Sequence, residues 1–425
     1  MPKPHLVLID PGHFHAALVQ KEMYEGLSPE AHVYAPLGSE LLDYLGRISR
    51  FNAQAEAPTR WQLQVQATPD FLERLAQEPR GGVAVIAGRN GVKIERIEAA
   101  VEAGLHVLAD KPAIIRREDL PRLAAVLDRA AERRLVVHDL MTGRQNEIGR
   151  VLRVLRGDPE VFGEPVPGNA AEPGVRLRNS HQLWKIVAGV PNRRPPWYFD
   201  ITEQGEALAD TGTHLVDRVH ETLFPGEALD YRRDIRVHSA ERWPTPLSLA
   251  QFREVTGEAA WPDFLAPWLK SDVLDYFCNG RLHYEIRGIY VGLECRWDWQ
   301  TEAGDDTHSA CYRGTRARLE LRQGKAEGYR AQLHVAPEAE VATALERRIA
   351  ALQAELPGIG LDRRDGEWRV VMPDGLRRGH DAHFAAFTRQ FLAYVEDPRT
   401  LPARYRPNLL AKYHVTTEGM ALSHG

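Results

Sequence analysis

The stretch VAVIAGRNGVKIERIEAAVEAGLHVLADKP, at residues 83–112, decides the fold of the first part of the chain. An apolar run leads into a turn that contains two glycines, a helical pattern follows to residue 103, and a second apolar run ends just before Lys111 and Pro112. Two strands joined by a helix in this way form a parallel β-α-β unit. The stretch therefore predicts a parallel sheet.

The same alternation extends in both directions along the chain. Strands are expected at residues 5–9, 32–35, 61–65, 82–87, 106–109 and 135–138, and helices at residues 13–24, 69–77, 91–103 and 117–133. Strands that alternate regularly with helices are typical of a doubly wound α/β domain. We expect this first domain to span residues 1–141. The connection at residues 37–60 is long, which suits either a lid over the ligand crevice or a surface excursion.

In a doubly wound sheet, ligands bind beyond the carboxyl ends of the strands. The turn DPGHFH, at residues 10–15, stands where a dinucleotide fingerprint G-x-G-x-x-G is expected, but only Gly12 is in register. Asp10 and His15 occupy the other two glycine positions, and Ala35 ends the second strand in place of an acidic residue. The turn by itself supports a nucleotide weakly, and an α/β domain without a ligand in this crevice is the alternative.

Three side chains near these turns are candidates for binding or chemistry. His13 and His15 flank Phe14, so both imidazoles can point at one ligand, or they can cap the following helix. Lys111 follows a buried strand, where an ammonium group can hydrogen-bond a substrate hydroxyl and favour its alkoxide. Pro112 restricts this lysine to an extended conformation. A surface lysine in a turn is the plainer interpretation.

A second candidate site lies in GEALADTGTHLVDRVHETLFPG, at residues 205–226. Its apolar residues recur at helical spacing, so Asp210 and His214, four residues apart, are expected on one face of a helix. A histidine oriented by a carboxylate can act as a general base, although such a pair also occurs on the wet face of an ordinary helix. Asp217, His220 and Glu221 permit a metal site, but no partner cluster with ligand spacing is evident, and no metal is predicted.

Composition narrows the class of protein. The chain has 425 residues, 43% hydrophobic and 27% charged, with a net charge of −5, so neither nucleic acid nor an anionic membrane is an expected partner. Three cysteines within one region predict buried thiols in a reducing compartment. With no signal peptide and no membrane-spanning apolar stretch, we expect a cytoplasmic protein that acts on small molecules.

The remainder, residues 142–425, is expected to form a second, α+β domain. Short strands with period-two alternation predict a large, mostly antiparallel sheet with one face covered. Insertions are expected near residues 243–270 and 337–372, the latter with an amphipathic helix at 338–356 that packs on the core, caps the sheet or contacts a partner. His181 and Lys185 precede a proline-rich loop at residues 190–200 that contains Trp197, and these residues can bind a sugar, although an interdomain linker also fits.

Two segments together resemble the glucose-fructose oxidoreductase / inositol dehydrogenase / MocA (Gfo/Idh/MocA) family. Residues 83–112 are similar to a family segment that ends in Glu-Lys-Pro, with Asp110 in place of the glutamate. Residues 197–217, WYFDITEQGEALADTGTHLVD, contain the family pattern D-x-G-x-H-x-x-D. The resemblance implies a Rossmann-like domain, an open-faced second sheet, and a homodimer or homotetramer formed through that sheet.

The resemblance also implies an NAD- or NADP-dependent oxidoreductase that transfers hydride between a nicotinamide and a sugar, polyol or glycoside. Lys111 and His214 would flank the reacting carbinol, with Asp210 positioning His214 or a substrate hydroxyl. The cofactor-binding residues it implies are Gly12, His13, Phe14 and His15 near the pyrophosphate, Asn90 and Asp110 near the nicotinamide, and Arg144. An NAD-dependent glycosidase that uses transient oxidation, and a non-catalytic sugar-binding protein with a decayed cofactor site, are the alternatives.

Overall fold

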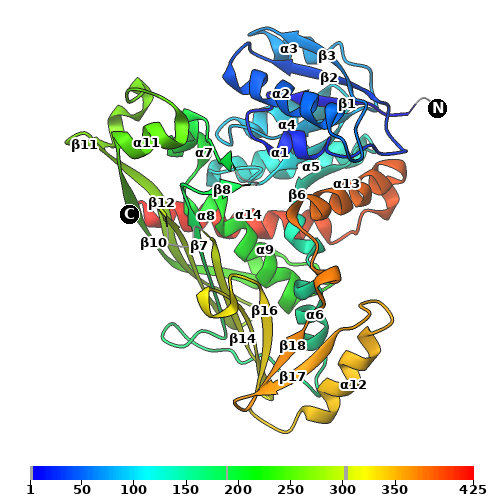
Figure 1. Cartoon of the computed structure of the whole chain (residues 1–425), viewed down its shortest axis with the longest axis vertical. Helices are drawn as coiled ribbons and strands as arrows, with labels where there is room; N and C mark the ends of the chain where they lie inside the picture. The colour runs from blue at the N-terminus through cyan, green and yellow to red at the C-terminus, as the bar shows by residue number, and fades with distance from the viewer. Residues whose placement is uncertain (1–2, 188–189, 301–304) are drawn as a thin grey trace. The chain divides into compact units, whose positions relative to one another are not determined.

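The computed structural model describes residues 3–187, 190–300 and 305–425, which divide into two compact units (Figure 1). Unit 1 comprises Met1–Thr142, Thr202–Gly205 and Gly379–Arg406, and unit 2 comprises Gly143–Ile201, Glu206–Arg378 and Pro407–Gly425. The expected division after residue 141 differs from this one, because two later segments return to unit 1. No helix among the described residues has the length and apolarity needed to cross a membrane.

Unit 1 is built on a six-stranded parallel sheet in the order β3-β2-β1-β4-β5-β6, which confirms the doubly wound prediction. Its strands are β1 (Leu6–Ile9), β2 (Glu30–Ala35), β3 (Gln62–Ala67), β4 (Val83–Ile86), β5 (His106–Asp110) and β6 (Val137–Leu140). Leu8 of β1 pairs with Val33 on one side and Val85 on the other. β1, β4 and β5 are therefore neighbours, and their carboxyl ends bring together turns that are distant in sequence.

The helices of unit 1 differ from prediction mainly near the N-terminus. They are α1 (His15–Leu18), α2 (Ser39–Ala53), α3 (Phe71–Leu75), α4 (Lys93–Glu102), α5 (Leu120–Glu132), α7 (Ile201–Gln204) and α13 (His380–Glu396), with the short 3-10 helices η1 (Arg117–Asp119) and η7 (Pro398–Thr400). The helix expected at residues 13–24 shortens to α1. The connection at 37–60 instead contains the fifteen-residue α2, whose Leu41, Tyr44 and Ile48 are buried in the core.

The core of unit 1 explains why α13 belongs to it. Leu6 and Leu8 point into a hydrophobic cluster with residues of α1 and α2, and the same cluster contains Phe384, Phe387 and Phe391 of α13. The intervening residues of β1 are buried on the opposite face of the sheet. The helix α4 packs on β4 and β5 and against α5. Both faces of the parallel sheet are therefore covered.

Unit 2 contains a large open-faced sheet in the order β10-β12-β13-β7-β14-β15-β16-β18-β17, with β11 paired to β12. The strands are β7 (Val175–Gln182), β10 (Ile235–Ser248), β11 (Leu269–Lys270), β12 (Val273–Ile286), β13 (Ile289–Asp298), β14 (Thr307–Arg313), β15 (Ala317–Gln323), β16 (Gln332–Pro337), β17 (Gly360–Arg364) and β18 (Glu367–Val371), and a separate pair is formed by β8 (Ile186–Val187) and β9 (Val190–Pro191). Along this order β13 and β7 pair in parallel and the other neighbours are antiparallel. The predicted mostly antiparallel sheet is confirmed.

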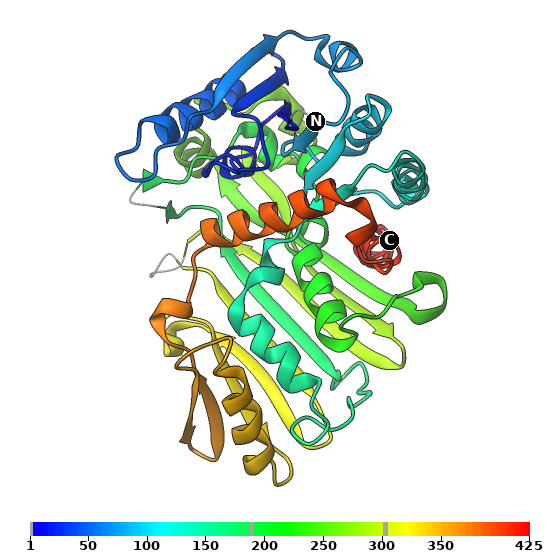
Figure 2. The same cartoon turned by 90° about the vertical axis from the view of Figure 1, so that its right-hand side faces the viewer.

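Helices cover one face of this sheet. Those of unit 2 are α6 (Glu147–Arg156), α8 (Ala207–Asp210), α9 (Gly212–Leu223), α10 (Tyr231–Asp234), α11 (Leu249–Thr256), α12 (Ala342–Leu352) and α14 (Tyr405–Ser423), with the 3-10 helices η2 (Thr142–Gln145), η3 (Pro196–Phe199), η4 (Asp263–Trp268), η5 (Lys325–Glu327) and η6 (Asp374–Leu376). α6 and α9 lie side by side on the sheet (Figure 2). On β15, Leu319 is buried whereas the neighbouring Arg318 and Glu320 face the open side.

The two expected insertions contain regular structure. α12 lies beside β17 (Figure 1), and its Leu345, Ile349 and Leu352 belong to the main core of unit 2, so this amphipathic helix packs on the core. The other insertion begins with the end of β10 and continues into α11, whose Phe252 is fully buried. The three cysteines are free thiols; Cys278 and Cys295 are buried, as expected, whereas Cys311 is only partly buried.

Candidate functional site

The turn after β1 forms in spite of its missing glycines. Asp10 has φ of 44°, in the left-handed region that glycine adopts most easily. The N–H of Gly12 donates to the Asp10 carbonyl at 2.8 Å, and the buried guanidinium of Arg96 pairs with the Asp10 carboxylate. At Gly88 an added Cβ would lie 2.7 Å from the Asp10 carbonyl oxygen. The close backbone approach thus occurs at Gly88, in the turn after the neighbouring strand.

His13 and His15 converge on one carboxylate. The Nδ1 atoms of His15 and His13 lie 3.0 and 3.3 Å from Oδ2 of Asp110, at the end of β5. Burial lowers the pKa of His15 to about 3, whereas the two histidines hold the pKa of Asp110 well below its usual range against the opposing effect of burial. α1 has no side-chain cap at its N-terminus. The imidazoles therefore belong to a cluster around an ionised Asp110.

Lys93 joins the turn after β4 to the end of β5. Sequence reasoning missed this residue. Its buried ammonium donates to Oδ1 of Asn90 at 2.5 Å and to the Asp110 carbonyl at 3.0 Å. The Asn90 amide in turn donates to the Gln204 carbonyl at 2.7 Å. Lys111 is half-buried, its N–H donates to Oδ1 of Asp110, and its bond to Pro112 is cis. Lys93 follows an ordinary helix-start pattern, which gives no sign of this role.

In unit 2, the helix expected at residues 205–226 is divided into α8 and α9. The break falls at Thr211, where the N–H of His214 donates to the Thr211 carbonyl and thereby forms a tighter first turn of α9. The buried Asp210 ends α8 and accepts a hydrogen bond from the Tyr198 hydroxyl at 3.4 Å. His214 is half-buried. Asp210 and His214 therefore lie on two separate helices, α8 and α9, rather than on one continuous helical face.

α9 is anchored by a buried ion cluster around Asp217. Arg144 donates from Nε and Nη2 to the two carboxylate oxygens at 2.9 and 2.6 Å, and Lys412 of α14 donates at 3.1 Å. These cations hold the pKa of Asp217 far below its usual range, although burial acts in the opposite direction. Arg144 also lies 3.6 Å from a carboxylate oxygen of Glu221, so both carboxylates considered for a metal site are paired with cations. The role of Arg144 in cofactor binding stays a prediction.

The three predicted substrate-binding residues all belong to unit 2. Nδ1 of His181 and Nζ of Lys185 each lie 2.9 Å from Oδ2 of Asp306, a residue that sequence reasoning missed because more than a hundred positions separate them. Trp197 is buried in η3. The buried Arg194 guanidinium lies 4.4 Å from the ring centroid of Tyr198, the residue that bonds Asp210. The structure thus brings His181 and Lys185 together on Asp306.

The fold and these side chains define an α/β protein of two units, with a parallel sheet in dinucleotide-binding order and a separate, mostly antiparallel sheet. Residues 151–424 match the family model "Putative oxidoreductase C terminal domain", and the chain belongs to this family of oxidoreductases.

Known proteins extend the likeness to the whole chain. A crystal structure of a "putative oxidoreductase" from Parabacteroides merdae is 38% identical over 99% of this chain and 98% of its own, with a TM-score of 0.95. A 3-ketoreductase from Actinomadura kijaniata, solved with NADP and TDP-benzene, shares the fold at 16% identity, with a TM-score of 0.59 over 99% of this chain and 98% of its own. An uncharacterized oxidoreductase of Synechocystis sp. is 27% identical over 44% of this chain, and the match spans 46% of that relative.

Proposed function

We propose that this oxidoreductase transfers hydride between NAD or NADP and a hydroxyl or keto group of a sugar, polyol or glycoside, as expected of the Gfo/Idh/MocA family. The observation that carries this function is the sheet order, which gathers three turns at the carboxyl ends of β1, β4 and β5. The 3-ketoreductase that shares this fold binds NADP, which supports the same cofactor class here.

Close packing of the turns after β1 and β4 supports a cofactor at this edge of the sheet. Gly88 permits this packing, because a Cβ there would meet the Asp10 carbonyl and the Gly12 nitrogen, at 2.7 and 3.3 Å. We assign Gly12, His13, Phe14 and His15 to the pyrophosphate side of the cofactor. Asn90 and Asp110, joined through Lys93, are assigned to the nicotinamide side.

The proposed chemistry needs one base and one cation. A nicotinamide held beside Asn90 and Asp110 would supply the hydride acceptor for the carbinol carbon. An imidazole nitrogen of His214 takes the hydroxyl proton, and Asp210 keeps the ring oriented and stabilises its charged form. Lys111 is assigned to the substrate oxygen, where its ammonium group would stabilise the negative charge that develops during the reaction. In the reductive direction His214 returns the proton to the alkoxide oxygen.

The substrate class follows from the groups around Asp306. His181 and Lys185, both paired with that carboxylate, are assigned to hydrogen bonds with substrate hydroxyl groups, and Trp197, which is buried in η3, is assigned to the wall of the same site. Such polar side chains suit a carbohydrate or polyol. A homodimer or homotetramer formed through the open face of the large sheet completes the proposal.

Nucleotide binding is the first test. Tag-free protein is titrated with NADH and NADPH, and quenching of its nine tryptophans is recorded for the wild type, Lys111→Ala and the matched control Lys21→Ala. Lys21 forms a surface ion pair with Asp381 in the same unit. We expect micromolar binding in all three proteins, because Lys111 is assigned to the substrate oxygen. Absence of binding at millimolar nucleotide would refute the proposal.

Turnover is the second test. With a panel of polyols, sugars and glycosides, formation of reduced nicotinamide should fall about 10²- to 10⁴-fold in Lys111→Ala, and remain at the wild-type level in Lys21→Ala. Release of an aglycone without net reduction of the cofactor would instead identify a glycosidase that uses transient oxidation.

A further inference from the structure

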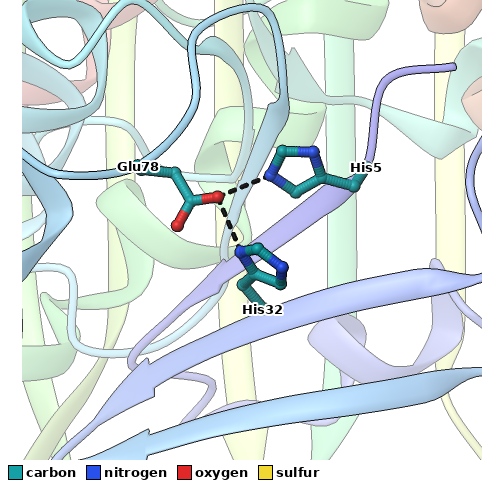
Figure 3. A group of neighbouring side chains, drawn as sticks. All are labelled: His5, His32 and Glu78. Carbon is teal, nitrogen blue, oxygen red and sulfur yellow. Dashed lines mark hydrogen bonds and ion pairs between the residues drawn. The ribbon is translucent and has the colours of Figure 1, made fainter. Parts of the chain in front are cut away.

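A second group of chemically active side chains lies away from the crevice of unit 1. His5 immediately precedes β1, His32 is in β2, and Glu78 lies between α3 and β4. Figure 3 shows both imidazoles pointing at the same carboxylate oxygen. The distances to Oε1 of Glu78 are 2.5 Å from Nε2 of His5 and 2.7 Å from Nδ1 of His32. Three potential ligand atoms from three chain segments therefore converge at one point.

We propose that His5, His32 and Glu78 form a binding site for one divalent transition-metal ion of the Zn²⁺ class. Two imidazole nitrogens and one carboxylate oxygen are the donor set of many zinc sites with three protein ligands, in which water takes the fourth position. All three ligand atoms lie within 4.8 Å of one another. A hard cation such as Mg²⁺ prefers an all-oxygen environment and should bind poorly.

The site is partly enclosed, and it has room for the fourth ligand. The side chain of Glu78 is 1% exposed, whereas those of His5 and His32 are 16% and 18% exposed. A cavity of about 280 Å³ opens beside them and is lined by His32, Tyr34, Glu78 and neighbouring residues. An ion can therefore enter from solvent and retain a water molecule on the cavity side.

Residues around the three ligands hold them in place. Tyr34 donates its hydroxyl hydrogen to Oε2 of Glu78, which leaves Oε1 for the histidines. Nε2 of His32, the nitrogen turned away from Glu78, lies 3.7 Å from a carboxylate oxygen of Glu30. Carboxylates and hydroxyls of this kind commonly orient metal ligands. Gly82 leaves space for His5, since a Cβ there would lie 3.2 Å from the imidazole.

Metal binding requires only a small local movement. Ligand atoms bound tetrahedrally to Zn²⁺ at about 2.0–2.1 Å lie about 3.3 Å apart, somewhat farther than the two hydrogen-bonded contacts here. Rotation of the carboxylate end of Glu78 and of the two rings supplies the difference. The bound ion would then join β1, β2 and the segment before β4, and stabilise unit 1.

A similar triad, His13, His15 and Asp110, provides the internal comparison. Its His15 ring packs against Phe384, and Asp110 also accepts the Lys111 N–H, so this cluster is already part of the packed turns of the crevice. The His5 triad differs because it opens on a cavity. Zinc should therefore be lost on substitution of His32, and retained on substitution of His13.

Isothermal titration with ZnCl₂ of chelator-stripped, tag-free protein tests the site. We expect a high-affinity site for about one ion per chain, weakened more than 100-fold in His32→Gln and Glu78→Gln, and about tenfold in Glu30→Gln, whose side chain lies outside the ligand set. His238→Gln is the matched control, because His238 also faces a carboxylate, Glu285 at 3.8 Å, in unit 2. Its affinity should equal that of the wild type.

A second readout separates lost binding from lost folding. Co²⁺ should give the visible absorption of a tetrahedral site in the wild type and in His13→Gln, and not in His32→Gln, while Zn²⁺ raises the unfolding temperature of the same two proteins only. His32→Gln replaces a partly exposed side chain and serves if Glu78→Gln does not fold. Absence of a high-affinity site in the wild type, binding that survives in His32→Gln, or loss of binding in His13→Gln would each overturn the proposal.

Discussion

Replacement of Asp217 by asparagine tests whether the buried ion cluster holds α9 in place. The wild-type carboxylate, 7% exposed, faces Lys412, which is 1% exposed, and Arg144, which is 24% exposed. Removing one member of a buried ion pair leaves an uncompensated charge and typically costs about 3–5 kcal/mol. Because water still reaches Arg144, we expect the lower end, about 3 kcal/mol.

Urea unfolding followed by tryptophan fluorescence measures this loss in unit 2, where eight of the nine tryptophans lie. With a slope of about 2–3 kcal/mol per molar urea, the midpoint should fall by about 1–1.5 M. Glu160→Gln is the matched control, because it removes a carboxylate that pairs with Arg347 on the surface of the same unit, where both side chains are 61% exposed. That change should cost less than about 1 kcal/mol.

The pH dependence of the same variant gives an independent check. The folded pKa of Asp217 lies below its unfolded value, so its charge stabilises the fold at neutral pH, and this contribution is lost as pH falls toward the folded value. The difference between wild type and Asp217→Asn should therefore narrow on acidification below about pH 4. Equal unfolding midpoints for Asp217→Asn and Glu160→Gln at neutral pH would refute the reasoning.

Three further changes probe the remaining features. Gly88→Ala should weaken NAD(P)H binding at least tenfold and cost about 1–3 kcal/mol, because its Cβ would lie 2.7 Å from the Asp10 carbonyl, whereas Gly26→Ala, with open space around it, should leave fluorescence titrations unchanged. His220→Leu should stabilise the protein by about 2 kcal/mol more at pH 5 than at pH 7.5. Burial lowers the pKa of His220 to about 3, so between pH 6.5 and 3 the unfolded wild-type chain takes up a proton that the folded chain does not. Equal shifts of the urea midpoint at both pH values would contradict this prediction. Asp306→Asn should raise KM for the carbohydrate about tenfold with little change in kcat, since it loosens both His181 and Lys185, and a fall in kcat alone in steady-state assays would count against a substrate-binding role.

The local pattern of apolar residues and turns was sufficient to predict the strands of the parallel sheet. Each expected strand of the first domain appears within a few residues of its predicted position, because a buried strand with its flanking turns is a short, contiguous signal. Helical periodicity was less reliable where tertiary contacts compete. The single helix expected around Asp210 and His214 is divided at Thr211, where the N–H of His214 donates to the Thr211 carbonyl, and apolar spacing does not reveal this break.

The sequence by itself determined the doubly wound topology, the mostly antiparallel second sheet, and the identity of the turns that gather at the strand ends. Tertiary structure alone decided which distant residues meet: α13 with the N-terminal core, Lys412 with Asp217, Asp306 with His181, and His5 with His32 and Glu78. The physical reason is the sequence separation over which each kind of interaction acts. Strand and helix patterns act over a few residues, whereas burial brings charged and imidazole groups together across tens to hundreds of residues, with no spacing rule that the chain itself displays.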